Sequence, residues 1–260
     1  PLTKEQVSLD NGGGGNWGAE DDGDINQIIN IWAPSPSGET KSTEEGVVRV
    51  PEDCITLYEA VASVYGDDRL TTIVVGKGEH QIDGIFLEIA SAMNIVGDPQ
   101  VPKIEIVVVG GIYFKEGIQG NCHLEHLTLR QAKGCGVIGE SSFTMEDVLV
   151  ELCGGYGVCA RGTGVVVRCT NVEVRQCGMS GMYVCDGASI TLIGAKTTVH
   201  HNCTKGDSNE YGLAVFSSSS TIQLVSPLTK EQISLDNGAG GNNWGAGYGG
   251  DINQIKTISQ

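Results

Sequence analysis

Hydrophobic and polar residues alternate in short stretches that recur about every 21 to 26 residues between positions 124 and 216. Each stretch places two side chains two positions apart on one face, which is typical of a short strand with one buried side. The side chains expected to point inward are Leu127 and Leu129, Val148 and Val150, Val172 and Val174, and Thr197 and Val199.

A second short strand follows each of the first ones after a glycine-containing turn. These strands begin at Gly136-Val137, Gly157-Val158, Gly181-Met182 and Gly212-Leu213. The intervening residues lack the 3.6-residue periodicity of a helix, which excludes ankyrin, helical leucine-rich and all-helical repeats. A strand–turn–strand unit repeated at this spacing predicts an all-β solenoid, in which apolar side chains stack from coil to coil.

The segment before the repeats carries the start signal of a helix. Thr56 and Glu59 have the spacing of a capping box, and Ala60, Val61 and Val64 share one face of the following turns. We therefore expect a short amphipathic helix near residues 56–65. A solenoid end exposes apolar side chains and strand edges, so this helix is expected to cap the N-terminal end.

Residues 55–82, ITLYEAVASVYGDDRLTTIVVGKGEHQI, resemble the opening of right-handed parallel β-helix proteins of the pectin-lyase-like superfamily. The repeats over 120–216 are similar to those of carbohydrate-active and carbohydrate-binding members. The resemblance implies an all-β, single-stranded right-handed parallel β-helix with a short N-terminal capping helix. Because the superfamily includes lyases, galacturonases, epimerases, viral tail spikes and non-catalytic repeat proteins, it implies a fold rather than an activity.

The two ends of the chain carry nearly the same sequence. Residues 1–28 and 227–255 align with one inserted Asn. They differ only at Val7/Ile233, Gly13/Ala239, Glu20/Gly247, Asp21/Tyr248 and Asp22/Gly249. The chain is therefore either a stretch of a tandem array or a unit whose two ends use the same closing element. This element resembles repeated sequences of non-catalytic algal-type proteins.

These observations divide the chain into three parts. We expect residues 1–46 to hold the first end element and a linker, 47–226 to form the β-helix, and 227–260 to form its last coils. In the last part, a long loop would precede a strand at residues 251–258. The first end element would either form an extra coil or lie along the outside of the solenoid.

Charge narrows the range of partners. The chain has 16 Lys and Arg against 32 Asp and Glu, a formal charge of −16. Phosphate binding needs clustered basic residues, so a nucleic-acid-binding module is excluded, and so is electrostatic docking on an anionic membrane. No apolar run approaches the roughly 18 residues that a membrane span needs. A glycan or protein partner and end-to-end self-association remain open.

The nine cysteines follow the repeats rather than a metal-binding motif. None lies in a Cys-x-x-Cys motif, and eight fall between Cys122 and Cys203. Cys153, Cys177 and Cys203 are separated by 24 and 26 residues, a repeat spacing. We expect them to be stacked, buried thiols, with disulfides as the alternative.

One outward row of side chains has the residue types of a catalytic site. These side chains flank the four positions expected to point inward, which are Leu129, Val150, Val174 and Val199. If those four point inward, their neighbours point outward in two rows. The first row holds Thr128, Leu149, Glu173 and Thr198, and the second holds Arg130, Glu151, Arg175 and His200.

These rows have two interpretations. As a site, Arg130 or Arg175 would bind a uronate carboxylate, Glu151 or Glu173 would act as acid or base, and His200 would shuttle a proton. As a structural feature, the row is a ladder of cross-strand ion pairs. We favour the ladder because the Asp pair of galacturonases and the Arg motif of lyases are not recognisable in this row.

Other candidate ligands are weaker. Trp17 and Trp244, each in Asn-Trp-Gly-Ala, are either sugar-stacking platforms or anchors for their loops. Asp21, Asp22 and Asp24 offer the oxygen ligands of calcium but match neither the EF-hand nor the nonapeptide spacing, so a solvated loop without a cofactor is expected. A metal site formed by His123, Glu125 and His126 is disfavoured because 123 and 126 lie on opposite faces of a strand.

Three functions are compatible with this sequence. The first is a non-catalytic binding or structural β-helix that recognises a glycan or a protein, in an extracellular or cell-surface location. The second is a lyase, hydrolase or epimerase of acidic glycans, which the charge of −16 disfavours because it repels polyanions. The third is a structural protein that assembles head to tail through its matched ends.

Overall fold

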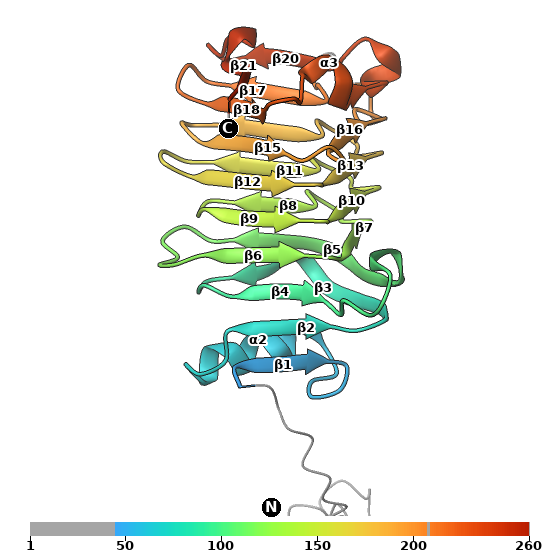
Figure 1. Ribbon diagram of the computed structural model, residues 1–260, viewed down its shortest axis with the longest axis vertical. Coiled ribbons are helices and arrows are strands. Elements are labelled where there is room, and N and C mark those ends of the chain that lie inside the picture. Colours follow the sequence, from blue (N-terminus) through green and yellow to red (C-terminus); the bar gives the residue numbers. More distant parts are fainter. Residues whose placement is uncertain (1–44, 207–208, 260) are drawn as a thin grey trace, which may run out of the picture. The chain divides into compact units, whose positions relative to one another are not determined.

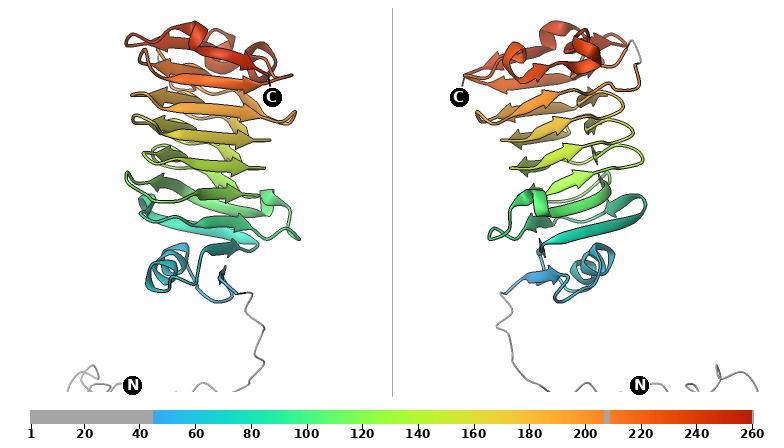
Figure 2. Two further views of the ribbon diagram at one scale, coloured as in Figure 1. Left: turned by 60° about the vertical axis from the view of Figure 1, so that its left-hand side comes forward. Right: turned by 90° about the vertical axis from the view of Figure 1, so that its right-hand side faces the viewer.

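The strands of the computed structural model stack as a right-handed parallel β-solenoid of about six coils (Figure 1). The structure describes residues 45–206 and 209–259. The expectation of an all-β solenoid with a short helix near its start is confirmed. Within the described part, the coils form parallel tiers, with α2 (Leu57–Gly66) at one end and the last coil at the other (Figure 2).

The first tiers contain irregular elements. They comprise β1 (Val47–Val50), α2, β2 (Thr72–Val75), β3 (Gly78–Ile89), β4 (Asn94–Gly97), the 3-10 helix η2 (Lys103–Glu105) and β5 (Ile106–Phe114). The long strand β5 pairs with β3 on one side and with both β7 and β8 on the other. It therefore joins two faces of the solenoid into one twelve-stranded sheet.

From residue 122 onward, each coil has three strands, called here the first, second and third. The first strands are β6 (Cys122–Glu125), β9 (Phe143–Glu146), β12 (Val166–Thr170), β15 (Ser189–Ile193) and β18 (Thr221–Val225). The second are β7 (Thr128–Arg130), β10 (Leu149–Glu151), β13 (Glu173–Arg175), β16 (Thr198–His200) and β19 (Ser234–Leu235). The third are β8 (Val137–Gly139), β11 (Val158–Arg161), β14 (Met182–Cys185), β17 (Leu213–Phe216) and β20 (Trp244–Gly247).

The register of the second strands places like residues above one another. Leu129 pairs with Val150, Val150 with Val174, and Val174 with Val199. All four side chains are fully buried. Burial of such a column removes apolar surface from water in every coil, at about 25 cal/mol per Å², so the predicted inward positions form the core.

A single left-handed residue turns three successive coils from the first to the second strand. His126, Asp147 and Asn171 occupy this corner with φ of 51, 50 and 52°. Asn, Asp and His are the non-glycine residues that tolerate this conformation best. At the start of the third strands, close stacking instead requires glycine, since a Cβ on Gly157 would lie 2.6 Å from the carbonyl oxygen of Gly181.

The helix α2 forms where the capping box predicted it. The Thr56 side chain accepts a hydrogen bond from the Glu59 N–H, and the Glu59 carboxylate accepts one from the Thr56 N–H. Its apolar face, which includes the buried Leu57 and Val61, packs beside β1 and β3. The helix lies at the N-terminal end of the stack (Figure 1).

The second end element forms a coil with more strand than the sequence indicated. β19, β20 and β21 (Ile255–Ile258) pair with β16, β17 and β18. The expected long loop before residues 251–258 is therefore wrong, because it contains β19 and β20. Between the strands lie α3 (Lys230–Ile233) and the 3-10 helices η3 (Asn237–Gly240) and η4 (Ile252–Gln254).

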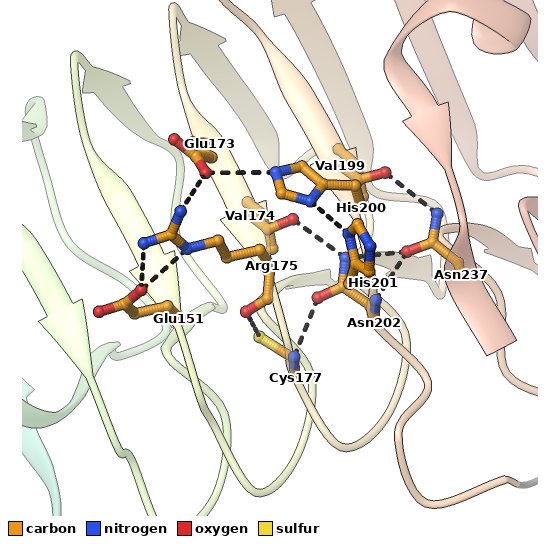
Figure 3. Close-up of polar contacts among 10 residues, drawn as sticks. All are labelled: Glu151, Glu173, Val174, Arg175, Cys177, Val199, His200, His201, Asn202 and Asn237. Atoms are coloured by element: carbon orange, nitrogen blue, oxygen red, sulfur yellow. Dashed lines mark hydrogen bonds and ion pairs between the residues drawn. The ribbon is translucent and has the colours of Figure 1, made fainter. Parts of the chain in front are cut away.

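Two buried asparagines connect the last coils at the corner after the second strand (Figure 3). Asn202 accepts the Cys177 N–H at 3.1 Å and donates to the Val174 carbonyl at 3.0 Å. One coil further, Asn237 accepts the Asn202 N–H at 2.9 Å and donates to the Val199 carbonyl at 3.0 Å. Both side chains are almost fully buried, so these amides satisfy backbone groups that water cannot reach.

We predict that Asn202→Ala lowers the free energy of unfolding by about 2–4 kcal/mol, because it strands a buried N–H and a buried carbonyl. Urea denaturation measures the change. The exposed Asn253 is the matched control, and its replacement by Ala should change stability by less than about 0.5 kcal/mol. Equal effects of the two substitutions would contradict a bridging role for Asn202.

Candidate functional site

The second strands bring the predicted row together. Parallel pairing aligns Arg130 with Glu151, Glu151 with Arg175, and Arg175 with His200. The same register aligns Glu173 with Thr198. We call Arg130, Glu151, Glu173, Arg175 and His200 the charged ladder.

Glu151 lies at the centre of the charged ladder. Its Oε1 accepts a hydrogen bond from Arg130 Nε at 2.6 Å, and its Oε2 accepts bonds from Arg175 Nε and Nη2 at 2.9 and 2.7 Å. Only 5% of its side chain is exposed. Burial acts to raise the pKa of Glu151, but the hydrogen bonds from Arg175 and Arg130 outweigh it and hold the pKa below its usual range.

The network continues to the next coils (Figure 3). Arg175 Nη1 donates to Glu173 Oε1 at 2.9 Å, and the same oxygen lies 3.2 Å from His200 Nε2. His200 Nδ1 is 2.8 Å from His201 Nδ1, so one of these two nitrogens carries the proton of their hydrogen bond. Each charged group of the ladder thus has a partner in its own or an adjacent coil.

Part of the two outward rows is covered, which the sequence did not predict. Thr128, Leu149 and Glu151 are exposed by only 0, 3 and 4%. The 3-10 helix η2 packs beside β7, where the Thr128 hydroxyl donates to the Lys103 carbonyl at 2.9 Å. A segment from an earlier coil therefore shields the start of rows that alternation alone placed in solvent.

This geometry limits the chemistry of the charged ladder. A general acid must hold a proton near neutral pH and reach the substrate. Glu151 has both oxygens held by arginines and a lowered pKa, so it is a poor proton donor. Glu173 Oε1 already accepts a hydrogen bond from Arg175 and lies against His200, so this oxygen is engaged within the ladder. The arrangement is that of an ion-pair ladder.

The histidines near β6 are not brought together. His123 contacts Thr144 and Glu125, whereas His126 contacts Asp147 and the Val101 carbonyl. Among the residues that the structure describes, no group of three or more His, Cys, Asp or Glu side chains can hold a metal ion. Asp21, Asp22 and Asp24 lie outside the described residues, so the expected solvated loop, with a calcium site as its alternative, stays a prediction.

Trp244 is built into the last coil. It begins β20, pairs with Leu213 of β17 and packs against the core while half-buried. The Lys230 ammonium lies 5.6 Å from its ring centre, within the range of a cation–π contact. These contacts suit an anchor of the end element. The equivalent Trp17 lies outside the described residues.

Several buried thiols are poor nucleophiles. All nine cysteines are free, and seven of them are buried. Burial raises the pKa of Cys169 to about 12, and that of Cys203 to about 12. For Cys177, a hydrogen bond with Cys153 and burial raise the pKa well above its usual value. Because the thiolate is the reactive form, these side chains act as small apolar core residues.

Sequence reasoning missed a column of aromatic rings on the outer face of the third strands. Tyr156, Tyr183, Phe216 and Tyr248 follow one another with ring centres 4.2, 5.0 and 5.6 Å apart. We call them the aromatic column. Two features of the sequence could have indicated this column. Alternation within the third strands places Tyr183 and Phe216 outward, and Tyr248 is a position at which the two end elements differ.

An open pocket lies at the last ring of this column. Its cavity volume is about 160 Å³, which is smaller than a site that encloses a drug-sized ligand, so it can hold only one edge or face of a ligand. Asn209, Tyr211, Phe216, Ala246, Gly247 and Tyr248 line it, and none of these side chains is charged. We call it the end pocket. Its position, on a face other than the charged ladder, makes it a separate candidate site.

We predict that Glu151→Gln lowers the free energy of unfolding at pH 7 by about 2–3 kcal/mol, because Arg130 and Arg175 lose a buried counter-charge. Solvent limits the loss, because the side chains of Arg130 and Arg175 are 26 and 33% exposed. Glu88→Gln is the control, since Glu88 pairs with Lys115 in solvent and should cost less than about 1 kcal/mol.

The same variant gives a test of pH dependence. A carboxyl with a lowered pKa in the folded state stabilises the fold above its unfolded pKa of about 4.3, and this contribution is lost as the pH falls through the folded value. The stability difference between the wild type and Glu151→Gln should therefore shrink below about pH 4. Denaturation curves at pH 7 and pH 3 measure it, and an unchanged difference would refute the ion-pair account.

Comparisons with protein-family models, curated proteins and solved structures find no match to this chain. No helix in the described ranges is long and apolar enough to cross a membrane. The parallel β-solenoid is thus established by the structure itself, and the functional proposal depends on the chain's own residues.

Proposed function

We propose that this chain is a non-catalytic binding module of pectin-lyase-like ancestry whose ligand is a glycan. The observation that supports it most strongly is the end pocket, where aromatic side chains meet an exposed amide on the face of the third strands. The pocket combines aromatic side chains with a polar amide, as ligand sites do, although it is a shallow surface hollow rather than an enclosed cavity. The paired strands β17 and β20 hold the lining residues Phe216, Ala246 and Gly247 in place.

The charged ladder argues against the enzyme alternative. Acid–base cleavage or epimerisation requires a group that can take up and release a proton at the substrate. Both oxygens of Glu151 are bound to arginines, and the guanidinium groups of Arg130 and Arg175 are in turn occupied by carboxylates. A uronate would have to displace these internal partners before it could bind Arg175.

The experiment is incubation with polyuronates and neutral glycans, with and without calcium, followed by mass analysis of the glycan and measurement of retention on the protein. We expect retention of at least one glycan and no change in its mass or stereochemistry. Arg175→Ala, at a site away from the end pocket, should retain the same glycan. A shortened, unsaturated or epimerised product would overturn the proposal, and so would the absence of retention.

A second candidate function, head-to-tail assembly, is favoured by one observation. β21 ends the nine-stranded sheet, and β19 and β20 end the twelve-stranded sheet. Among the described residues, all three strands of the last coil thus have one edge without a strand partner, and such edges can pair with another chain.

If these edges assemble, the mass measured by light scattering should grow with protein concentration. Replacing Thr257 by Pro in the edge strand β21 should suppress the growth, because proline removes a backbone donor. Ser218→Ala, at an exposed position outside the strands, is the control and should leave the growth unchanged. A constant monomer mass at high concentration would exclude assembly.

A further inference from the structure

The end pocket differs from the rest of the aromatic column in its accessibility. Each inner ring of the column is covered on two sides, since Tyr183 lies between Tyr156 and Phe216. Tyr248 is the last ring of the column and is 91% exposed. Among the described residues, it therefore has one ring face that no other ring of the column covers. A ligand with a flat apolar face can continue the column at this point.

The backbone around Tyr248 is shaped to present the ring. Tyr248 has a φ of 48°, in the left-handed region that bulky residues rarely adopt. The preceding Gly247 allows Phe216 to lie directly over the strand, since a Cβ there would be 2.7 Å from a Phe216 ring carbon. The chain thus brings Phe216 and Tyr248 together at 5.6 Å between ring centres without burying Tyr248.

The repeated end element supplies independent evidence. Of the five aligned differences between residues 1–28 and 227–255, three are consecutive, at Gly247, Tyr248 and Gly249. The first end element carries Glu20, Asp21 and Asp22 there. Two of these three positions, Gly247 and Tyr248, line the end pocket, and the second end element has Gly-Tyr-Gly where the first has three acids. The aromatic ring of the end pocket is thus a feature of the second end element that the first one lacks.

The charge of the end pocket indicates the class of ligand. The protein carries −16, so an anionic ligand is repelled, yet none of the six lining side chains is charged. Glu210, which follows Asn209, is only 8% exposed and accepts the Ser180 N–H at 3.0 Å. The net negative charge therefore disfavours an anionic ligand, and the six lining side chains include no carboxylate that could pair with a cationic one.

We propose that the end pocket binds a neutral pyranose unit of a glycan, stacked on Tyr248, with Asn209 as a hydrogen-bonding partner. Aromatic ring faces carry negative potential, so they attract the weakly positive C–H groups on one face of a pyranose. The Asn209 amide can both donate to and accept from sugar hydroxyls. This inference rests on the proposed glycan-binding function and assigns it a site, a ligand class and a residue that determines specificity.

The test is calorimetric titration of the full chain with maltohexaose, cellohexaose and hexagalacturonate. We expect at least one neutral hexasaccharide to bind and hexagalacturonate to bind more weakly. Tyr248→Ala should weaken neutral binding about tenfold, as the loss of one stacking ring does elsewhere, and Tyr248→Phe should retain most of it. Tyr248→Asp, which restores the residue of the first end element, should abolish it.

Tyr58→Ala is the matched control, because Tyr58 is a partly exposed tyrosine of α2 at the other end of the solenoid. Its replacement should leave glycan binding unchanged. If the wild type binds a glycan that Tyr248→Ala and Tyr248→Asp bind equally well, the site assignment is wrong while the proposed function stands. If hexagalacturonate binds more tightly than the neutral glycans, the ligand class is wrong, and if nothing binds, both proposals fail.

Discussion

Parallel pairing between successive coils is the constraint on which the rest of the structure depends. Strands in register about 4.8 Å apart place each side chain directly against the residue at the same position of the next coil. Inside the solenoid, this produces the column Leu129, Val150, Val174 and Val199. At the corner, it places Asn202 above Asn237, whose amides satisfy the backbone of the coil before.

The same constraint has different consequences on two outer faces. On the second strands, opposite charges alternate, so Glu151 and Glu173 each pair with an arginine, and the pairs of Glu151 link adjacent coils. On the third strands, aromatic rings cover one another until the column reaches Tyr248, where a ring remains exposed. The exposed ring of Tyr248 at the end of the aromatic column is where we propose that the ligand binds.

Much of the fold could be predicted because it repeats locally. The strand positions, the α2 capping box and the pairing of Arg130, Glu151 and Arg175 depend on neighbours at fixed spacing. The cover over Thr128 could not be predicted, since it comes from η2, an irregular segment about one coil earlier in the chain. The aromatic column was equally hidden, because loops of unequal length separate its members in the sequence and only the folded coils align them.

The central claim is that the charged ladder holds the coils together while the end pocket binds the ligand. Hydrogen–deuterium exchange with and without a retained neutral hexasaccharide tests it most directly. The account predicts slower exchange in residues 209–216 and 244–249, which contain the end pocket, and unchanged exchange in β7, β10, β13 and β16. Protection of those four strands, with none around Tyr248, would contradict it.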